Sequence, residues 1–213
     1  MVTGQARERA DAARNRRLIL RAAEDLLARG GPGHVSIDEV AATAGVGKGT
    51  VFRRFGSRAG LMHALVEQHV LDLADSVASG PHPLGPGAPA ETRLTAFLDA
   101  VVEITTRHAA ILAAYDHALT AQESAAFSER VSSVYQAWHA HISGLITEAR
   151  PGLDSELLAH ILLESLHSDL VRRLLAQGDS QRVTATLHYL VAVLLNSPPG
   201  TGAPVVPSGL SNP

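Results

Sequence analysis

Cysteine is absent from the 213-residue sequence, and this absence removes several kinds of chemistry. Without thiols the chain has no disulfide, no thiolate metal site and no cysteine nucleophile. A chain without disulfides fits a reducing compartment, so we expect the protein to be cytoplasmic. Its length allows one large domain or two small ones, and either would bury a hydrophobic core.

Long apolar runs are also missing. The N-terminal stretch is rich in arginine and has no apolar run before Leu18, so we expect it to be neither a signal peptide nor a membrane anchor. No apolar stretch elsewhere reaches the roughly 20 residues of a membrane-spanning helix. The sequence therefore predicts no membrane partner.

Catalytic motifs are a third absence. The sequence has eleven histidines, but it contains no Gly-x-Ser-x-Gly elbow, no His-Glu-x-x-His pair and no dinucleotide fingerprint. Scattered histidines usually have ordinary roles in the core or at the surface. We therefore expect neither an enzyme nor a bound cofactor.

The net charge of −3 conceals a strong asymmetry along the chain. Residues 1–58 contain 11 Lys and Arg against 6 Asp and Glu, whereas residues 59–213 contain 7 against 15. A basic segment joined to an acidic one is typical of a protein whose basic segment binds polyanionic phosphate and whose acidic segment does not. Chance clustering is the alternative interpretation.

Helical periodicity dominates the sequence, and no segment shows the sustained alternation of a half-buried strand. The sequence therefore predicts an all-α protein. The first helix is expected over about residues 11–28, with Leu18, Ala22 and Leu26 on one apolar stripe. Further helices are predicted at about 36–44, 48–55, a longer stretch containing 61–70, 91–107, 108–119, 124–148, 155–177 and 180–196. Proline and glycine mark a linker at 81–89, and the tail 197–213 is expected to be disordered.

A helix-turn-helix pattern follows the first predicted helix. Ser36 and Glu39 have the spacing of a capping box, which starts a short helix. Ala41 is small where two helices cross closely, Gly45 tolerates a left-handed turn, and Val46 fills the corner between the helices. The small core of this motif is expected to consist of Ile37, Val40, Val51 and Phe55.

The second helix of the motif keeps four polar residues on the outside, namely Lys48, Thr50, Arg53 and Arg54. These side chains donate hydrogen bonds, which suits phosphate oxygens and base edges in the major groove of DNA. The run GVGKGT at residues 45–50 also invites comparison with a phosphate-binding loop. That alternative fails because Ala42 stands where the first glycine is required and Gly49 stands where Ser or Thr must bind magnesium.

Residues 44–58 read AGVGKGTVFRRFGSR and resemble the signature of the TetR family of transcriptional regulators. The match runs from the first helix through Leu61. The resemblance implies an N-terminal three-helix DNA-binding head with a helix-turn-helix, followed by a C-terminal helical domain for ligand binding and dimerisation. It implies phosphate contacts at Ser36, Thr50, Phe52, Arg54 and Arg58, and it places Lys48, Gly49 and Arg53 nearest the bases.

Three positions depart from the family signature. Phe52 replaces the usual tyrosine and lacks its hydroxyl, so that hydrogen bond to phosphate is lost. Arg54 replaces the common histidine and is permanently charged. Gly47 replaces the usual serine, so the second helix of the motif lacks its ordinary side-chain cap.

The last two predicted helices are apolar on more than one side. The family resemblance implies that they pair with their mates in a dimeric four-helix bundle, and the apolar pattern agrees with that arrangement. An ordinary monomeric core is the alternative. A homodimer would hold two DNA-reading helices about one duplex turn apart, roughly 34–36 Å. The residues expected at the interface are Leu158, Leu162, Leu166, Leu187, Leu190, Val191 and Leu194.

Aromatic and polar residues within apolar stripes indicate a pocket for a small-molecule effector, because such sites are mostly apolar with a few polar groups. The residues expected to line it are Phe97, Val101, Ile104, His108, Tyr115, Phe127, Val131, Tyr135, Trp138 and His167. Plain core packing is an equal alternative for the aromatic stripe. His160, Glu164 and His167 share one helix face, where a hydrogen-bonded structural trio is commoner than a metal site, so we expect no metal.

The sequence as a whole predicts a ligand-responsive repressor that binds palindromic operator DNA as a homodimer and is released by a small molecule. The DNA-binding domain is expected at 1–58 and the effector-binding and dimerisation domain at 59–196. One alternative is an enzyme acting on a small molecule in the C-terminal domain, which turnover by that domain would reveal. Another is a ligand-independent DNA-architectural protein, against which the long aromatic-bearing C-terminal domain argues.

Overall fold

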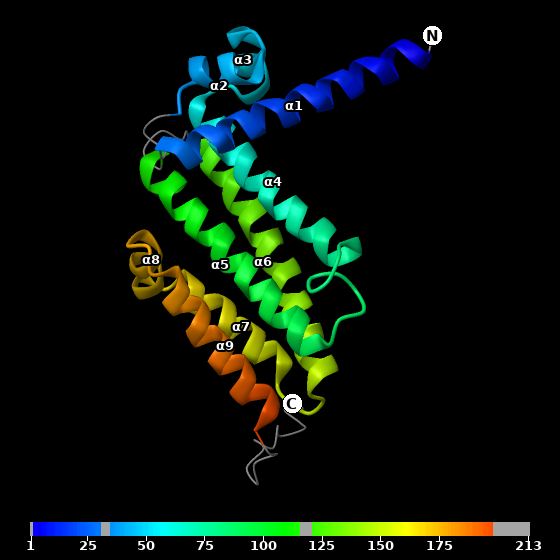
Figure 1. Cartoon of the computed structure of the whole chain (residues 1–213), viewed down its shortest axis with the longest axis vertical. Helices are drawn as coiled ribbons and strands as arrows, with labels where there is room; N and C mark the ends of the chain where they lie inside the picture. The colour runs from blue at the N-terminus through cyan, green and yellow to red at the C-terminus, as the bar shows by residue number, and fades with distance from the viewer. Residues whose placement is uncertain (1, 31–34, 116–120, 198–213) are drawn as a thin grey trace, which may run out of the picture.

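The computed structural model describes the backbone of residues 2–30, 35–115 and 121–197, and it describes no side chain in residues 1–10 or 108–131. Within these ranges every regular element is a helix, which confirms the all-α prediction (Figure 1). The helices are α1 (Val2–Gly30), α2 (Ile37–Ala44), α3 (Lys48–Phe55), α4 (Arg58–Ser79), α5 (Ala90–Tyr115), α6 (Ala121–Ala149), α7 (Ser155–His167), α8 (Asp169–Ala176) and α9 (Ser180–Asn196).

The helices α1, α2 and α3 form a small head with the first turns of α4. Figure 1 shows α1 crossing the top of the molecule, with α2 and α3 beside its C-terminal half and its N-terminal half projecting beyond them. Ile19, Val40, Val51 and Leu61 are fully buried in the core of this head. The head therefore has a hydrophobic core of its own, to which each of its four helices contributes.

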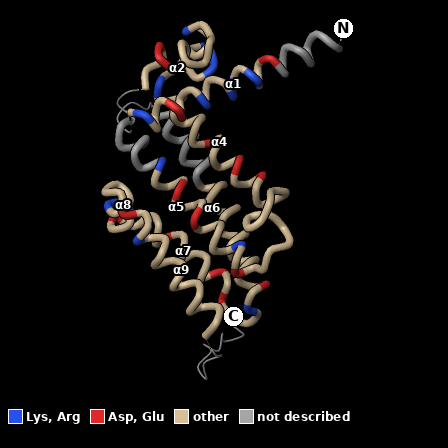
Figure 2. The backbone as a smooth tube through the Cα atoms, in the orientation of Figure 1, with Lys and Arg blue, Asp and Glu red and all other residues tan. Residues whose placement is uncertain are grey.

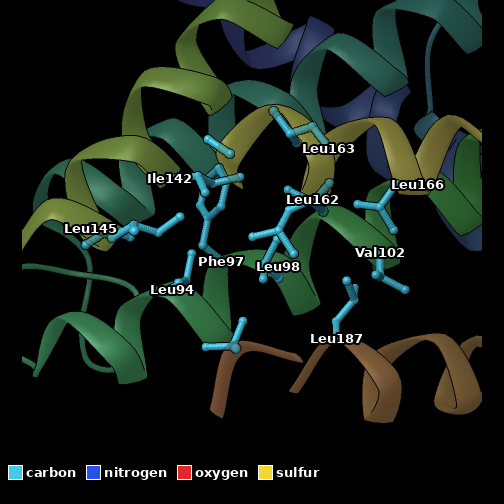
Figure 3. Close-up of a cluster of buried hydrophobic side chains, with 14 of the residues drawn as sticks. Leu94, Phe97, Leu98, Val102, Ile142, Leu145, Leu162, Leu163, Leu166 and Leu187 are labelled. Atoms are coloured by element: carbon cyan, nitrogen blue, oxygen red, sulfur yellow. The ribbon is translucent and has the colours of Figure 1, made fainter. Parts of the chain in front are cut away.

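The larger body is built around α5, which contacts α4, α6, α8 and α9. Figure 3 shows Phe97 and Leu98 of α5 meeting Ile142 of α6, Leu163 of α7 and Leu187 of α9 in one cluster. Burying such large apolar side chains contributes about 1.5–3 kcal/mol each. The body is therefore a packed bundle in which α5 is the central helix.

Helix α4 belongs to both cores. Its residues from Ala59 to Val66 pack in the head, whereas Leu73 and Val77 pack in the body. By packing, the head thus extends past residue 58, the boundary expected from the sequence, and the division falls within α4. Because α4 packs in both cores, it connects the head to the body as one continuous helix.

Several predicted helix limits are wrong. A break was expected between residues 107 and 108, but α5 continues through it because no glycine or proline interrupts the chain there. A single helix was expected over 155–177, but Ser168 ends α7 and its hydroxyl accepts a hydrogen bond from the amide of Val171 to start α8. In α1, Leu18 is exposed and Ile19 and Ala23 are buried instead.

No helix in the described ranges is long and apolar enough to cross a membrane. The linker expected at 81–89 does separate two helices of the body, α4 and α5. The predicted tail lies almost entirely outside the described residues, which end at Ser197.

Candidate nucleic-acid interface

The start of α2 is fixed by the capping box expected from the sequence. The Oγ of Ser36 accepts a hydrogen bond from the amide of Glu39 at 3.1 Å and donates to the Glu39 carboxylate at 2.8 Å. The amide of Ser36 also donates to that carboxylate at 3.2 Å. The hydroxyl of Ser36 is therefore already used within the protein, and a phosphate contact from it remains a prediction.

The turn between α2 and α3 depends on Gly45. Its φ of 67° lies in the left-handed region that glycine adopts without strain, and its amide donates to the carbonyl groups that end α2. Val46 is half-buried against the head core, as expected of a residue that fills the corner. Gly47 then precedes α3 without any side-chain cap, in agreement with the predicted loss of the usual serine.

The outer face of α3 is basic and open. Arg53 and Arg54 are exposed and make no hydrogen bond or ion pair with another described residue. Phe52 lies beside them with half of its surface exposed, whereas its neighbour Val51 is fully buried. Exposed guanidinium groups without partners are suited to phosphate oxygens and to the N7 and O6 atoms of guanine.

Lys48 differs from the two arginines because it already has a partner. Its Nζ lies 2.8 Å from one carboxylate oxygen of Asp38 on α2 and 3.0 Å from the other. Both side chains are exposed, so the pair is accessible to a ligand. Asp38 was not among the residues predicted from the sequence, although a carboxylate ten residues before a lysine on the next helix could have indicated this ion pair.

The remaining predicted DNA-binding residues are less open. Gly49 is exposed, Thr50 is half-buried in the first turn of α3, and Arg58 is half-buried in the first turn of α4. Ser57 caps α4 by accepting a hydrogen bond from the amide of Gly60 at 3.0 Å. The structure therefore places the eight predicted residues at the N-cap of α2, in α3 and in the first turn of α4, and their contacts with DNA remain predictions.

The residues predicted to line the effector pocket differ in burial, and some lie outside the described residues. Phe97, Val101 and Ile104 are buried in the body core, and Tyr135 and Trp138 are half-buried against it. The predicted side chains of His108, Tyr115, Phe127 and Val131 lie outside the described residues. An apolar hollow in the body has none of the predicted residues in its wall, which is lined by Leu94, Ile146, Leu158, Leu162, Val191, Leu194 and Leu195.

A polar cluster lies between α6 and α7. The Tyr135 hydroxyl oxygen is 2.6 Å from Nδ1 of His160, and the rings of Tyr135 and His167 have centroids 6.2 Å apart. Desolvation raises the pKa of Tyr135, and the charge of Glu164 and a hydrogen bond to it add to this rise. Nδ1 of His167 instead bonds to the carbonyl of Leu163 at 3.0 Å, and within the described part of the chain no three His, Asp or Glu residues are placed to hold a metal ion.

A second aromatic contact lies between α5 and α6. The Phe97 ring meets His141 edge-on at a centroid distance of 4.6 Å and Trp138 at 6.2 Å. Burial lowers the pKa of His141, and the positive charge of Arg93 lowers it further. Nε2 of His141 is buried and has no hydrogen-bond partner among the described residues, which favours the neutral ring.

The residues expected at the dimer interface also fall into two groups. Leu162, Leu166, Leu187 and Val191 are only 1–4% exposed, so they belong to the core of this chain and have no surface to offer a second copy. Leu190 is exposed, and Leu158 and Leu194 are half-buried. The outward faces of α7 and α9 instead carry exposed apolar residues that the sequence argument did not select, namely Leu157, Ile161, Tyr189 and Val193.

Comparison with known proteins agrees with this geometry. Residues 19–65 match the sequence model described as bacterial regulatory proteins of the tetR family. A putative TetR-family transcriptional regulator from Rhodococcus sp. has 22% sequence identity and a TM-score of 0.57, over 86% of this chain and 99% of that one. No curated protein matches the chain by sequence.

Two further solved structures have similar folds. NalD, the secondary repressor of the MexAB-OprM multidrug efflux pump in Pseudomonas aeruginosa, shares 23% identity over 89% of this chain and all of its own, with a TM-score of 0.52. The regulator FadR from Bacillus subtilis, solved with stearoyl-CoA, shares 15% identity over 85% of this chain and 98% of that one, also with a TM-score of 0.52. Residues 19–65 therefore match the tetR family model, and the chain as a whole has the fold of the solved TetR-family regulators.

Proposed function

We propose that the protein is a ligand-responsive repressor that binds palindromic operator DNA as a homodimer and is released by a small-molecule effector. The observation that carries this proposal is the outer face of α3, where Arg53 and Arg54 are exposed and make no hydrogen bond or ion pair with another described residue. A positively charged helix of this size fits the major groove, where arginine contacts both phosphates and guanine. In this proposal Arg54, Thr50 and Arg58 bind phosphates, and Lys48 and Arg53 lie nearest the bases.

Dimerisation is supported by the outward faces of α7 and α9, which lie side by side along the body (Figure 1). Tyr189 on α9 is 70% exposed, and Leu157 and Ile161 on α7 are 53% exposed. The only Lys, Arg, Asp or Glu residue of α9 is Arg182, in its first turn (Figure 2). Exposed apolar residues on two helices of the body are typical of a homodimer interface, and a two-fold dimer would require a palindromic operator.

The effector in this proposal is a small, largely apolar molecule bound in the body near Tyr135 and Trp138. Support comes from two half-buried aromatic side chains next to polar groups at the junction of α5, α6 and α7. A ligand shifts the DNA-binding equilibrium only by its difference in affinity for the two conformations. A coupling of about 1–3 kcal/mol would weaken DNA binding roughly 5- to 150-fold.

The test is selection of bound duplexes from a random pool by the full chain, followed by affinity measurements on the selected sequence. Two similar half-sites about one helical turn apart, roughly 34–36 Å, are expected. The variant Arg54→Gln should bind all duplexes more weakly, and Arg53→Gln should alter base preference at one position. The control variant Arg173→Gln removes an exposed arginine from α8 and should leave binding unchanged. A pool that shows no sequence enrichment would rule out the operator-binding proposal.

A further inference from the structure

The N-terminal half of α1 projects beyond the rest of the head (Figure 1). Among the described side chains of α1 the first buried one is Ile19, whereas those from Asp11 to Leu18 are exposed or half-buried. At a rise of about 1.5 Å per residue, the helix spans roughly 21 Å from Val2 to Arg16, whose side chain contacts α4. An isolated helical segment of this length is marginal in water, so a contact partner would stabilise it.

The charge of this helix is strongly positive and is concentrated on one side. Between residues 11 and 23 there are four arginines and one acidic residue, Asp11. Arg16 is used within the protein, because it donates to Gln68 at 2.7 Å and lies 3.3 Å from Glu67, both on α4. The other three, Arg14, Arg17 and Arg21, are exposed and have no hydrogen bond or ion pair with another described residue.

The position of Arg16 fixes where the other arginines lie. At about 100° per residue, Arg14 and Arg21 stand roughly 160° and 140° around the helix from Arg16, so they face away from α4. Figure 1 shows that this projecting helix is at the same end of the molecule as α3. A duplex whose major groove receives α3 would therefore extend along the side on which α1 projects.

We propose that Arg14, Arg17 and Arg21 form a second DNA contact surface, which binds phosphates flanking the segment read by α3. The inference rests on the proposed function, since it takes duplex DNA as the partner. Guanidinium groups on an exposed helix bind phosphate without reading sequence, so this surface adds affinity and not base preference. The projecting α1 acts as an arm along the duplex, and the operator footprint exceeds the two half-sites.

The test compares duplexes of two lengths, both carrying the sequence selected from the random pool. The short duplex ends at the outer edges of the half-sites, and the long duplex adds about one helical turn on each side. The full-length variant Arg14→Gln/Arg17→Gln/Arg21→Gln is measured against the wild type over a series of salt concentrations. The control variant Arg172→Gln/Arg173→Gln/Arg182→Gln removes three exposed arginines from α8 and α9.

On the long duplex we expect the α1 variant to lose at least about tenfold in affinity, and its salt slope to fall by up to about 5, since six arginines of a dimer contribute about 0.9 each. On the short duplex the affinity of the α1 variant should equal that of the wild type. A second variant, in which Arg14, Arg17 and Arg21 are each replaced by lysine, should keep most of the wild-type affinity for the long duplex. An unchanged slope on the long duplex, or an equal loss on both lengths, overturns the proposal. If the pool gives no selected sequence, the proposed operator binding fails. The salt dependence of affinity is then measured on an arbitrary duplex of about four turns, and equal salt slopes for the α1 variant and the control variant overturn the proposed α1 contact as well.

Discussion

Glu24 of α1 and Arg107 of α5 join the head directly to the central helix of the body, with Nη1 of Arg107 donating to the Glu24 carboxylate at 2.9 Å. The same carboxylate oxygen lies 3.1 Å from Nε2 of His69 on α4. Arg107 follows Ile104, a core residue of the body, by one helical turn. The Glu24–Arg107 pair therefore connects α5 to α1 directly, in addition to the connection through α4.

We expect Glu24→Gln to weaken operator binding while leaving the fold intact. Both Glu24 and Arg107 are nearly half-exposed, so their ion pair contributes only about 0.2–1 kcal/mol to stability, and the melting temperature should change little. Without this ion pair the orientation of the head relative to the body is less restricted, which should lower operator affinity roughly two- to fivefold. Glu148→Gln breaks a comparable pair with Arg93 inside the body, so equal operator affinity for the two variants would contradict this role of Glu24.

The helix-turn-helix could be predicted because its signals are local. The capping pair of Ser36 and Glu39 and the glycines at 45 and 56 act on neighbouring residues, so the bounds of α3 follow from the chain around it. Residues 107 and 108 carry no comparable signal, so no glycine, proline or capping residue supported the break expected there. The start of α8 at Ser168 was missed because a capping serine inside an apolar run resembles any other polar residue.

Contacts between distant segments could not be predicted. A stripe of leucines shows that a helix face is buried but not which surface covers it, and Leu162 and Leu187 meet their own chain where a second copy was expected. The same holds for Tyr135 and His160, which are 25 residues apart and meet only because α6 and α7 pack together. Sequence therefore identified the apolar helices, and tertiary packing decides which of their faces remain outside.

Asp38 is expected to restrain Lys48 at the DNA-reading face. Asp38→Asn removes the carboxylate that holds Nζ at 2.8 Å and also removes a negative charge facing the phosphates. Binding to all duplexes should tighten about two- to fivefold, and stability should fall by only about 0.3–1 kcal/mol through loss of an acidic group in the first turn of α2. Asp75→Asn removes an exposed carboxylate from the part of α4 that packs in the body and serves as the control. Anisotropy titrations that show no gain for Asp38→Asn would refute the restraint.

We expect the exposed apolar residues of α9 to form the dimer interface. Leu190→Glu places a charge on the outward apolar face, where burial against a second copy would strongly disfavour it. Sedimentation should show a monomer, and operator affinity should fall by at least about tenfold because a single head makes half of the contacts. Leu71→Glu on α4 alters a leucine that is also exposed, and it should remain dimeric. An unchanged dimer for Leu190→Glu would place the interface elsewhere.

His141 is expected to make the fold sensitive to acid. Its pKa in the folded protein is lowered from 6.5, first by burial and then by Arg93. The unfolded chain therefore binds a proton at a higher pH than the folded chain does, so the stability due to the neutral ring is present above about pH 6.5 and is lost as the pH falls through the folded pKa.

The variant His141→Phe keeps a ring against Phe97 and removes the buried nitrogen that has no partner. Its melting temperature at neutral pH should be close to that of the wild type or higher, because no buried polar atom is left without a hydrogen bond. Between neutral pH and about pH 5, its melting temperature should fall less than that of the wild type. His82→Gln, at an exposed position before α5, should retain the wild-type pH dependence. Parallel curves for the wild type and His141→Phe would show that another group controls the acid sensitivity.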